Sequence, residues 1–196
     1  MSSLLFALTF IIIGLSASLP VSGSTSSSSA SKFDIAVLND VHLELLYDPY
    51  GAPEDACRPN SSRSTIFAPF GRHGCDSPLS LFTPTLAKMR SVLPHPNLIL
   101  IPGDLVSHTV PTGRKGSFDP VRYERLKETI STYTRGIAAT FPGVPIVFTP
   151  GNDDYVINYN VPDVAHKADY YQFMYQRWVK DILANNIAVY SSIARA

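Results

Sequence analysis

The chain has 196 residues, of which 45% are hydrophobic, and its 16 Lys and Arg residues balance its 16 Asp and Glu residues. Because this balance gives no net electrostatic field, the composition does not indicate a nucleic-acid partner or an anionic membrane surface. The hydrophobic fraction is sufficient for a folded core, and the chain length after an N-terminal leader corresponds to one domain at most.

The N-terminus predicts a secretory route. Residues 4–15 are apolar apart from Thr9 and Gly14, and the run is too short to span a bilayer and typical of the hydrophobic part of a signal peptide. Small residues at 21–23 form an acceptable cleavage site, so we expect a signal peptide at 1–23, with a signal anchor as the alternative because no Lys or Arg precedes the apolar run. Residues 24–32 read as a Ser-rich tether. The expected location is secreted, or the lumen of a vacuole or lysosome.

The first predicted element of the folded part is a strand at Phe33–Asn39, which ends at the polar turn Asp40-Val41-His42. Asp40 and His42 are two residues apart, so in an extended segment both side chains leave the same side of the chain. A carboxylate and an imidazole placed in this way can bind one cation.

A long insertion rich in Pro, Gly and Ser follows and contains Cys57 and Cys75. In an oxidising compartment these two cysteines are expected to form a structural disulfide. Closing a loop of ~18 residues is worth about 3 kcal/mol in the chain-entropy model. Asn60 begins an N-S-S sequon inside this loop and is a candidate glycosylation site, the alternative being an unused surface tripeptide.

Helices and strands alternate through the rest of the chain, which predicts an α/β fold with the order βαβαβ and a last helix. The predicted elements are a helix at 79–93, a strand at 97–101, a helix at 120–140, a strand at 144–149 and a helix at 168–183. The strands are continuous apolar runs of the kind that parallel sheets bury. In the middle helix Val121, Leu126, Ile130 and Ile137 trace an apolar stripe. The aromatic residues of the last helix favour core packing over lipid binding.

Two further strands also end at polar turns, Gly103-Asp104 and Gly151-Asn152. Ligands of open α/β sheets gather outside the carboxyl ends of the strands, so these turns are expected to meet the Asp40–His42 turn. The Asp104 carboxylate can bridge two cations, and Asn152 adds a neutral carbonyl oxygen. Each turn alone is common, but the three together predict a metal site.

The order of these D-x-H, G-D and G-N turns resembles the calcineurin-like metallophosphoesterase superfamily. The segment G-D-L-V-S-H at 103–108, the C-D-S-P at 75–78 that opens a helix, and the Cys-bearing insertion resemble the acid sphingomyelinase-like branch, which includes vacuolar endopolyphosphatases. The resemblance implies a metallophosphoesterase-like sandwich, of which this chain supplies the first βαβαβ half as an incomplete domain at 33–196.

The resemblance also implies a site and a function. Asp40, His42, Asp104 and Asn152 would bind two divalent cations (Zn, Mn or Fe), and His108 would be a proton donor or a phosphate-binding group. The reaction would be hydrolysis of a phosphate ester or anhydride, with a phosphorylated small molecule, a lipid or polyphosphate as substrate. Contact with a membrane is expected only through a lipid substrate.

Two features depart from the pattern of the superfamily. Asp153 stands where most members have His after the G-N turn, and the only His beyond Asn152 is His166, which lacks a G-H-x-H context. Either the chain is the first half of a longer enzyme, or it is a non-catalytic secreted protein that keeps the fold.

Overall fold

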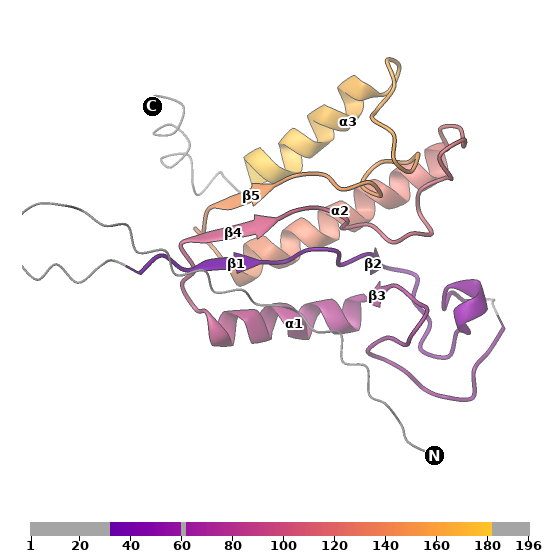
Figure 1. The fold of residues 1–196 in the computed structure, drawn as a ribbon, viewed down its shortest axis with the longest axis horizontal. Coiled ribbons are helices and arrows are strands. Elements are labelled where there is room, and N and C mark those ends of the chain that lie inside the picture. The colour runs from indigo at the N-terminus through magenta and orange to yellow at the C-terminus, as the bar shows by residue number, and fades with distance from the viewer. Residues whose placement is uncertain (1–31, 60–61, 182–196) are drawn as a thin grey trace, which may run out of the picture.

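The computed structural model describes residues 32–59 and 62–181. Its elements in chain order are β1 (Ile35–Val37), β2 (Leu43–Glu44), the short helix η1 (Pro53–Asp55), β3 (Ser77–Pro78), α1 (Leu79–Val92), β4 (Leu98–Ile101), α2 (Pro120–Thr140), β5 (Ile146–Phe148), α3 (Lys167–Met174) and the π-helix η2 (Tyr175–Asp181) (Figure 1). The predicted signal peptide 1–23, the predicted tether apart from Lys32, and Asn60 lie outside the described residues.

The main sheet has the strand order β1-β4-β5, and both of its strand pairs are parallel. Ala36, Ile99 and Ile146 lie side by side across it. With α1 between β1 and β4, and α2 between β4 and β5, the predicted βαβαβ order is confirmed. The strands are shorter than predicted: β4 begins one residue later, and β1 and β5 are shorter at both ends. β2 and β3 form a separate small parallel pair.

The two faces of the main sheet differ in burial. Ala36, Ile99 and Ile146 are buried in the cluster that also contains the inner residues of α1 and α2, and α2 crosses behind the sheet in Figure 1. The next residues along the strands point the other way, and Val147 among them is 46% exposed. Parallel strands are commonly covered on both faces. Within the described residues, the second face of this sheet is less well covered than the first.

Helix α2 begins and packs as its sequence predicts, with one exception. The Asp119 carboxylate accepts hydrogen bonds from the backbone N–H groups of Val121 and Arg122 at 2.9 and 3.2 Å, which is a standard N-cap. Leu126, Ile130 and Ile137 of the predicted apolar stripe are fully buried, whereas Val121 is 63% exposed. The prediction for Val121 is wrong because its place in the first turn of α2, beside the N-cap, leaves its side chain in solvent.

The last helix is a core element. The predicted single helix is divided into α3 and the π-helical η2, and its predicted end at residue 183 lies outside the described residues. Trp178 stacks on Phe148 of β5 with ring centroids 4.1 Å apart, and Tyr170 is buried. These contacts confirm the preference for core packing. No helix within residues 32–59 and 62–181 is both long and apolar enough to cross a membrane.

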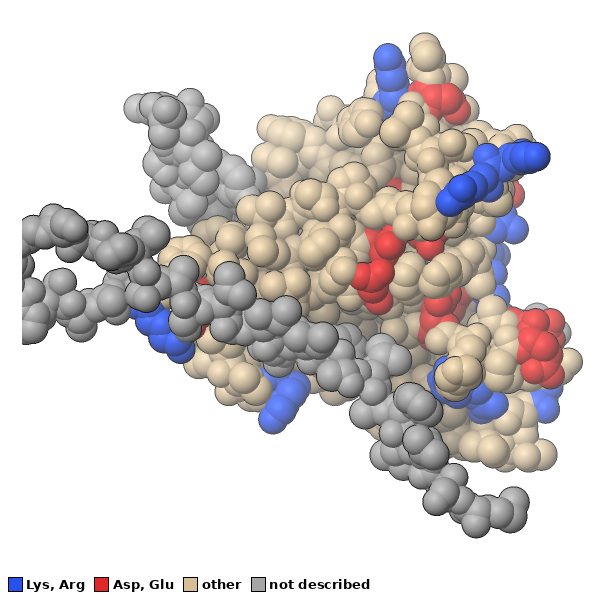
Figure 2. All heavy atoms as spheres, in the orientation of Figure 1, with Lys and Arg blue, Asp and Glu red and all other residues tan. Residues whose placement is uncertain are grey.

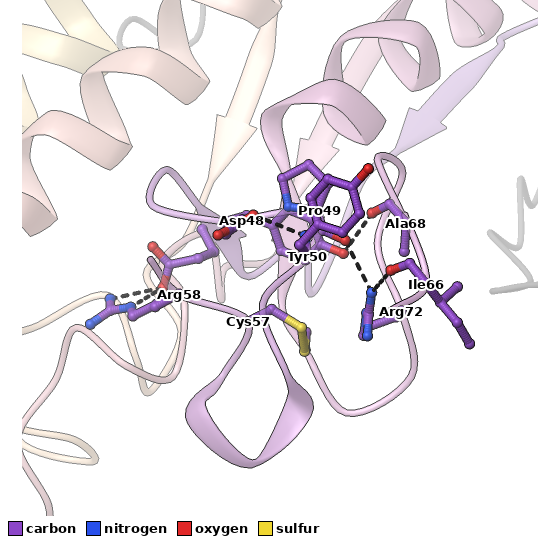
Figure 3. The surroundings of a disulfide bond; sticks show 11 residues. Asp48, Pro49, Tyr50, Cys57, Arg58, Ile66, Ala68 and Arg72 are labelled. Carbon is purple, nitrogen blue, oxygen red and sulfur yellow. Dashed lines mark hydrogen bonds and ion pairs between the residues drawn. A yellow bond between two sulfur atoms is a disulfide. The ribbon is translucent and has the colours of Figure 1, made fainter. Parts of the chain in front are cut away.

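The insertion between β2 and β3 is fastened by the expected disulfide, which joins Cys57 to Cys75 with 5.9 Å between the Cα atoms (Figure 3). Arg72 donates hydrogen bonds to the carbonyl oxygens of Pro49, at 3.0 Å, and Ile66. These bonds connect the two arms of the loop. The segment that ends at Cys75 therefore has a defined position at the start of β3.

Glu44 connects the insertion to the loop after β4. Its side chain is 3% exposed and accepts hydrogen bonds from Arg58 Nε and Nη2 at 2.9 and 2.8 Å, and from Ser107 Oγ at 2.9 Å. Burial raises the pKa of Glu44, but the hydrogen bonds from Thr109 and the Leu46 N–H, together with Arg58, outweigh it and leave the pKa below its ordinary value of 4.5.

The lowered pKa gives a stability prediction. A carboxylate whose folded pKa is depressed stabilises the fold above its unfolded pKa, and this stability is lost as the pH falls through the folded pKa. Glu44→Gln should lower the free energy of unfolding at pH 7 by about 1.5–3 kcal/mol. The difference from wild type should shrink as the pH falls below 4.5. Urea unfolding at several pH values measures it, and a pH-independent difference would contradict the account.

Candidate metal centre

The turns after β1 and β4 lie side by side. The backbone N–H of Asp40 donates to the Gly103 carbonyl at 3.2 Å, and that of His42 donates to the Asp104 carbonyl at 3.0 Å. These bonds continue the parallel pairing of β1 and β4 beyond the ends of the strands. They place the D-x-H turn against the G-D turn, as the sequence predicted.

The local reason given from the sequence is wrong. Asp40, His42 and Asp104 have φ values of 52°, 43° and 54°, in the left-handed region, so the Asp40–His42 segment is not extended. Non-glycine residues in this region cost of order 1–3 kcal/mol each, and such residues cluster at functional sites. Backbone turns, not strand alternation, therefore bring these side chains together.

Glycines allow the close approach of the turns after β4 and β5. A Cβ atom on Gly151 would lie 2.3 Å from the backbone nitrogen of Asp104, and one on Gly103, whose φ is +112°, would lie 2.2 Å from the nitrogen of Gly151. Asn152, the fourth predicted ligand, directly follows this contact. It lies half-buried at the same edge of the sheet.

Three of the predicted ligands form one group. One ligand atom from each of Asp40, His42 and Asp104 lies within 4.8 Å of the ligand atoms of the other two. His42 Nε2 lies 3.9 Å from Asp40 Oδ1. His42 Nδ1 is 3.1 Å from the carbonyl oxygen of Val106, a contact that orients the ring and leaves Nε2 free. Figure 2 shows acidic side chains gathered on the face where the strands end.

His108 stacks on His42, with ring centroids 3.9 Å apart. Asp76 orients it: His108 Nδ1 is 2.8 Å from Asp76 Oδ1, and the His108 backbone N–H donates to Asp76 Oδ2 at 2.9 Å. Partial burial lowers the pKa of His108, but the hydrogen bond and charge of Asp76, with Asp153 and Asp104 nearby, outweigh it and raise the pKa above 6.5. His108 therefore presents Nε2 to the site and favours its cationic form.

Asp153, which departs from the pattern of the superfamily, points into the site. It is fully buried, and its Oδ2 lies 3.8 Å from His42 Nδ1 and 3.7 Å from His108 Nε2 without a hydrogen-bond partner. Burial raises the pKa of Asp153, and the nearby charges of His108 and His42 offset only part of the rise. Its backbone N–H donates to Asp104 Oδ1 at 3.1 Å.

Asp154 ties the turns after β4 and β5 together. Its buried carboxylate accepts hydrogen bonds from the backbone N–H groups of Leu105, Val106 and Gly151 at 2.8, 3.2 and 2.8 Å. Burial raises the pKa of Asp154, although these N–H groups oppose the rise. The Tyr170 hydroxyl donates to the Asp154 carbonyl oxygen at 2.9 Å, so α3 supports the same turn.

The Asp76–His108 pair gives a second prediction. In metal-free protein, the NMR titration of His108 should have its midpoint above 6.5, and Asp76→Asn should lower the midpoint because it removes the negative charge. The raised pKa means that the pair stabilises the fold below about pH 6.5 and loses this effect as the pH rises through the folded pKa. Asp163→Asn, which alters the separate Asp163–His166 pair, is the control. An unchanged midpoint in Asp76→Asn would refute the pairing.

The donor set suits divalent cations. Carboxylates, one imidazole and an amide oxygen are ligands for Mn²⁺, Fe and Zn²⁺. The Asp104 carboxylate is close to both neighbouring turns, as its contacts with the Asp153 N–H and the Asp40–His42 group show. The residues present therefore fit a cation at the Asp40–His42–Asp104 group.

The chain is similar to known phosphoesterases. Residues 33–193 match the profile of the family described as calcineurin-like phosphoesterase. The chain is 26% identical over 119 residues to sphingomyelinase phosphodiesterase D of Dictyostelium discoideum, covering 61% of this chain and 24% of that protein. It is 29% identical over 117 residues to human acid sphingomyelinase-like phosphodiesterase 3b, covering 59% of this chain and 24% of that protein. The matched part spans about a quarter of the length of these relatives. The chain belongs to the calcineurin-like phosphoesterase family.

Proposed function

We propose that this chain carries part of a metal-dependent site that hydrolyses phosphate esters or anhydrides. The observation that supports the proposal is the convergence of Asp40, His42 and Asp104 within 4.8 Å at the carboxyl ends of the parallel strands β1 and β4, with His108 stacked on His42. The family match supports the reaction class, and the positions of the side chains support the roles proposed for them.

In this proposal Asp40, His42, Asp104 and Asn152 would hold two divalent cations, of Zn, Mn or Fe. Asp40 and His42 would be ligands of the first cation, Asp104 would contribute its carboxylate to both, and Asn152 would offer the second a neutral oxygen. When bound, such cations activate water as a nucleophile and neutralise charge on the phosphoryl oxygens.

The chain's own residues supply orientation and a proton. The Val106 carbonyl fixes the ring of His42, and the Asp153 N–H fixes the Asp104 carboxylate. His108 carries a proton on Nε2 in its cationic form, while Asp76 holds Nδ1. His108 therefore donates this proton to the leaving oxygen or stabilises the phosphoryl group as a cation.

The substrate is a phosphodiester lipid of the sphingomyelin type, another small phosphodiester, or polyphosphate. The relatives' names support the phosphodiester side of this range. Secretion or a vacuolar or lysosomal lumen is part of the same proposal, supported by the Cys57–Cys75 disulfide and the apolar run at 4–15. A signal peptide at 1–23 and a glycan on Asn60 belong to it as well.

The test is hydrolysis of bis-p-nitrophenyl phosphate with Mn²⁺, alongside sphingomyelin and polyphosphate. His108→Ala should lower kcat by ~10²–10⁴, the usual contribution of a positioned acid, while the Mn²⁺ affinity changes less than about threefold because His108 is outside the Asp40–His42–Asp104 group. Chelation should abolish turnover. Mn²⁺ binding without hydrolysis of any of the three substrates would refute the catalytic role and favour a non-catalytic binding protein.

A further inference from the structure

Asp153 has an environment that the proposed phosphoesterase site does not use. It is fully buried, its Oδ1 accepts a hydrogen bond from Asn158, and its Oδ2 has no partner. A buried carboxylate oxygen without a hydrogen bond is costly because burial removes its water, and the nearby charges of His108 and His42 offset only part of this cost. Such an atom is a candidate ligand for a bound cation.

Two imidazole nitrogens face this oxygen. His42 Nδ1 and His108 Nε2 lie 3.8 and 3.7 Å from it, beyond hydrogen-bond distance. Ligands held at ~2.1 Å by a tetrahedral Zn²⁺ ion are ~3.4 Å apart, so each pair need close by only about 0.3–0.4 Å. All three ligand atoms lie within 4.8 Å of one another.

We propose that His42, His108 and Asp153 form a zinc site that is an alternative to the Asp40–His42–Asp104 group, with which it shares His42. Two imidazoles and one carboxylate are the ligand set of several mononuclear zinc centres, which leave a further position open. The neighbouring group is richer in carboxylates and favours harder cations such as Mn²⁺. The two sites therefore differ in metal preference.

The two sites exclude each other because both use His42. Zinc on Nδ1 requires that this nitrogen give up its contact with the Val106 carbonyl, and the neutral ring then carries its proton on Nε2. A protonated Nε2 cannot bind the cation beside Asp40. Zinc at this site also occupies His108 Nε2, so excess Zn²⁺ should inhibit the hydrolysis. The inhibition rests on the proposed function, but zinc binding does not.

Calorimetric titration of Zn²⁺ into the metal-free chain tests the site without reference to activity. Asp153→Asn and His108→Ala should each weaken Zn²⁺ binding by at least ~10-fold, since loss even of a group behind a ligand costs 10–100-fold. Asp104→Asn should change it less than about threefold. The His108 side chain is 61% exposed, so His108→Ala keeps the test valid if Asp153→Asn fails to fold.

Co²⁺ titration followed by visible absorption gives a second readout. Wild type and Asp104→Asn should show the intense bands of low-coordinate Co²⁺, and Asp153→Asn should lack them. Absence of Zn²⁺ binding to wild type would overturn the proposal. Equal weakening by Asp104→Asn and Asp153→Asn would also overturn it, because the cation would then occupy one shared site.

Discussion

Asp104→Asn is expected to lower the affinity of the protein for Mn²⁺ by at least ~10²-fold, and any Mn²⁺-dependent hydrolysis with it, because a direct ligand contributes no less than a group that orients one. Asn tolerates the left-handed φ of 54° at this position. Its side-chain oxygen also still accepts the hydrogen bond from the Asp153 N–H. The substitution therefore removes the negative charge with little other change.

The matched control is Asp163→Asn, which neutralises an exposed carboxylate that contacts Ala165 and His166, outside the candidate metal centre. It should leave the Mn²⁺ affinity unchanged. Calorimetric titration of both variants, with circular dichroism to confirm folding, measures the difference. If Asp104→Asn bound Mn²⁺ like wild type, Asp104 would not be a ligand.

Gly151→Ala is expected to destabilise the fold by about 3 kcal/mol or more, at the upper end for overpacking of a dense site. The added Cβ would lie 2.3 Å from both the backbone nitrogen and Oδ1 of Asp104. Backbone atoms cannot move aside as a flexible side chain can, so the turns after β4 and β5 must separate. The displaced Asp104 should also lose Mn²⁺.

Gly113→Ala is the control for this experiment. A Cβ on Gly113 would meet no atom within 4 Å, and its φ is outside the left-handed region. Urea unfolding of both variants should show a large loss for Gly151→Ala and almost none for Gly113→Ala. Comparable stability of Gly151→Ala and wild type would mean that the two turns are not in contact.

The order of elements was predictable because strong local signals coincide with it. The apolar runs that became β1, β4 and β5 end in polar turns, and Asp119-Pro120 marks the start of α2. Parallel pairing then places the turns at one edge of the sheet. Asp40, His42 and Asp104 meet for this reason, although their backbone conformation differs from the extended segment that the spacing suggested.

Contacts between distant segments were not predictable from one sequence. Asp76 and His108 are 32 positions apart, and they meet because the insertion folds back so that β3 pairs with β2 beside His42. In the sequence, Asp153 was visible only as a residue that replaces the His found after the G-N turn in most of the superfamily. Its burial between two imidazoles depends on the packing of three turns. The role of Asp154 could not be predicted from the sequence beyond its place in G-N-D-D. Its hydrogen-bond partners are backbone N–H groups, which no residue type in the sequence marks.

Anomalous diffraction from crystals soaked in Mn²⁺ is the most direct test of the metal centre, since it locates the cation without reference to activity. We expect a Mn²⁺ peak within about 2.0–2.6 Å of the carboxylates of Asp40 and Asp104 and of His42 Nε2. We also expect this peak to disappear in Asp104→Asn. No peak at this position in wild-type crystals, or a peak that does not involve Asp104, would contradict the assignment of these turns as a metal centre.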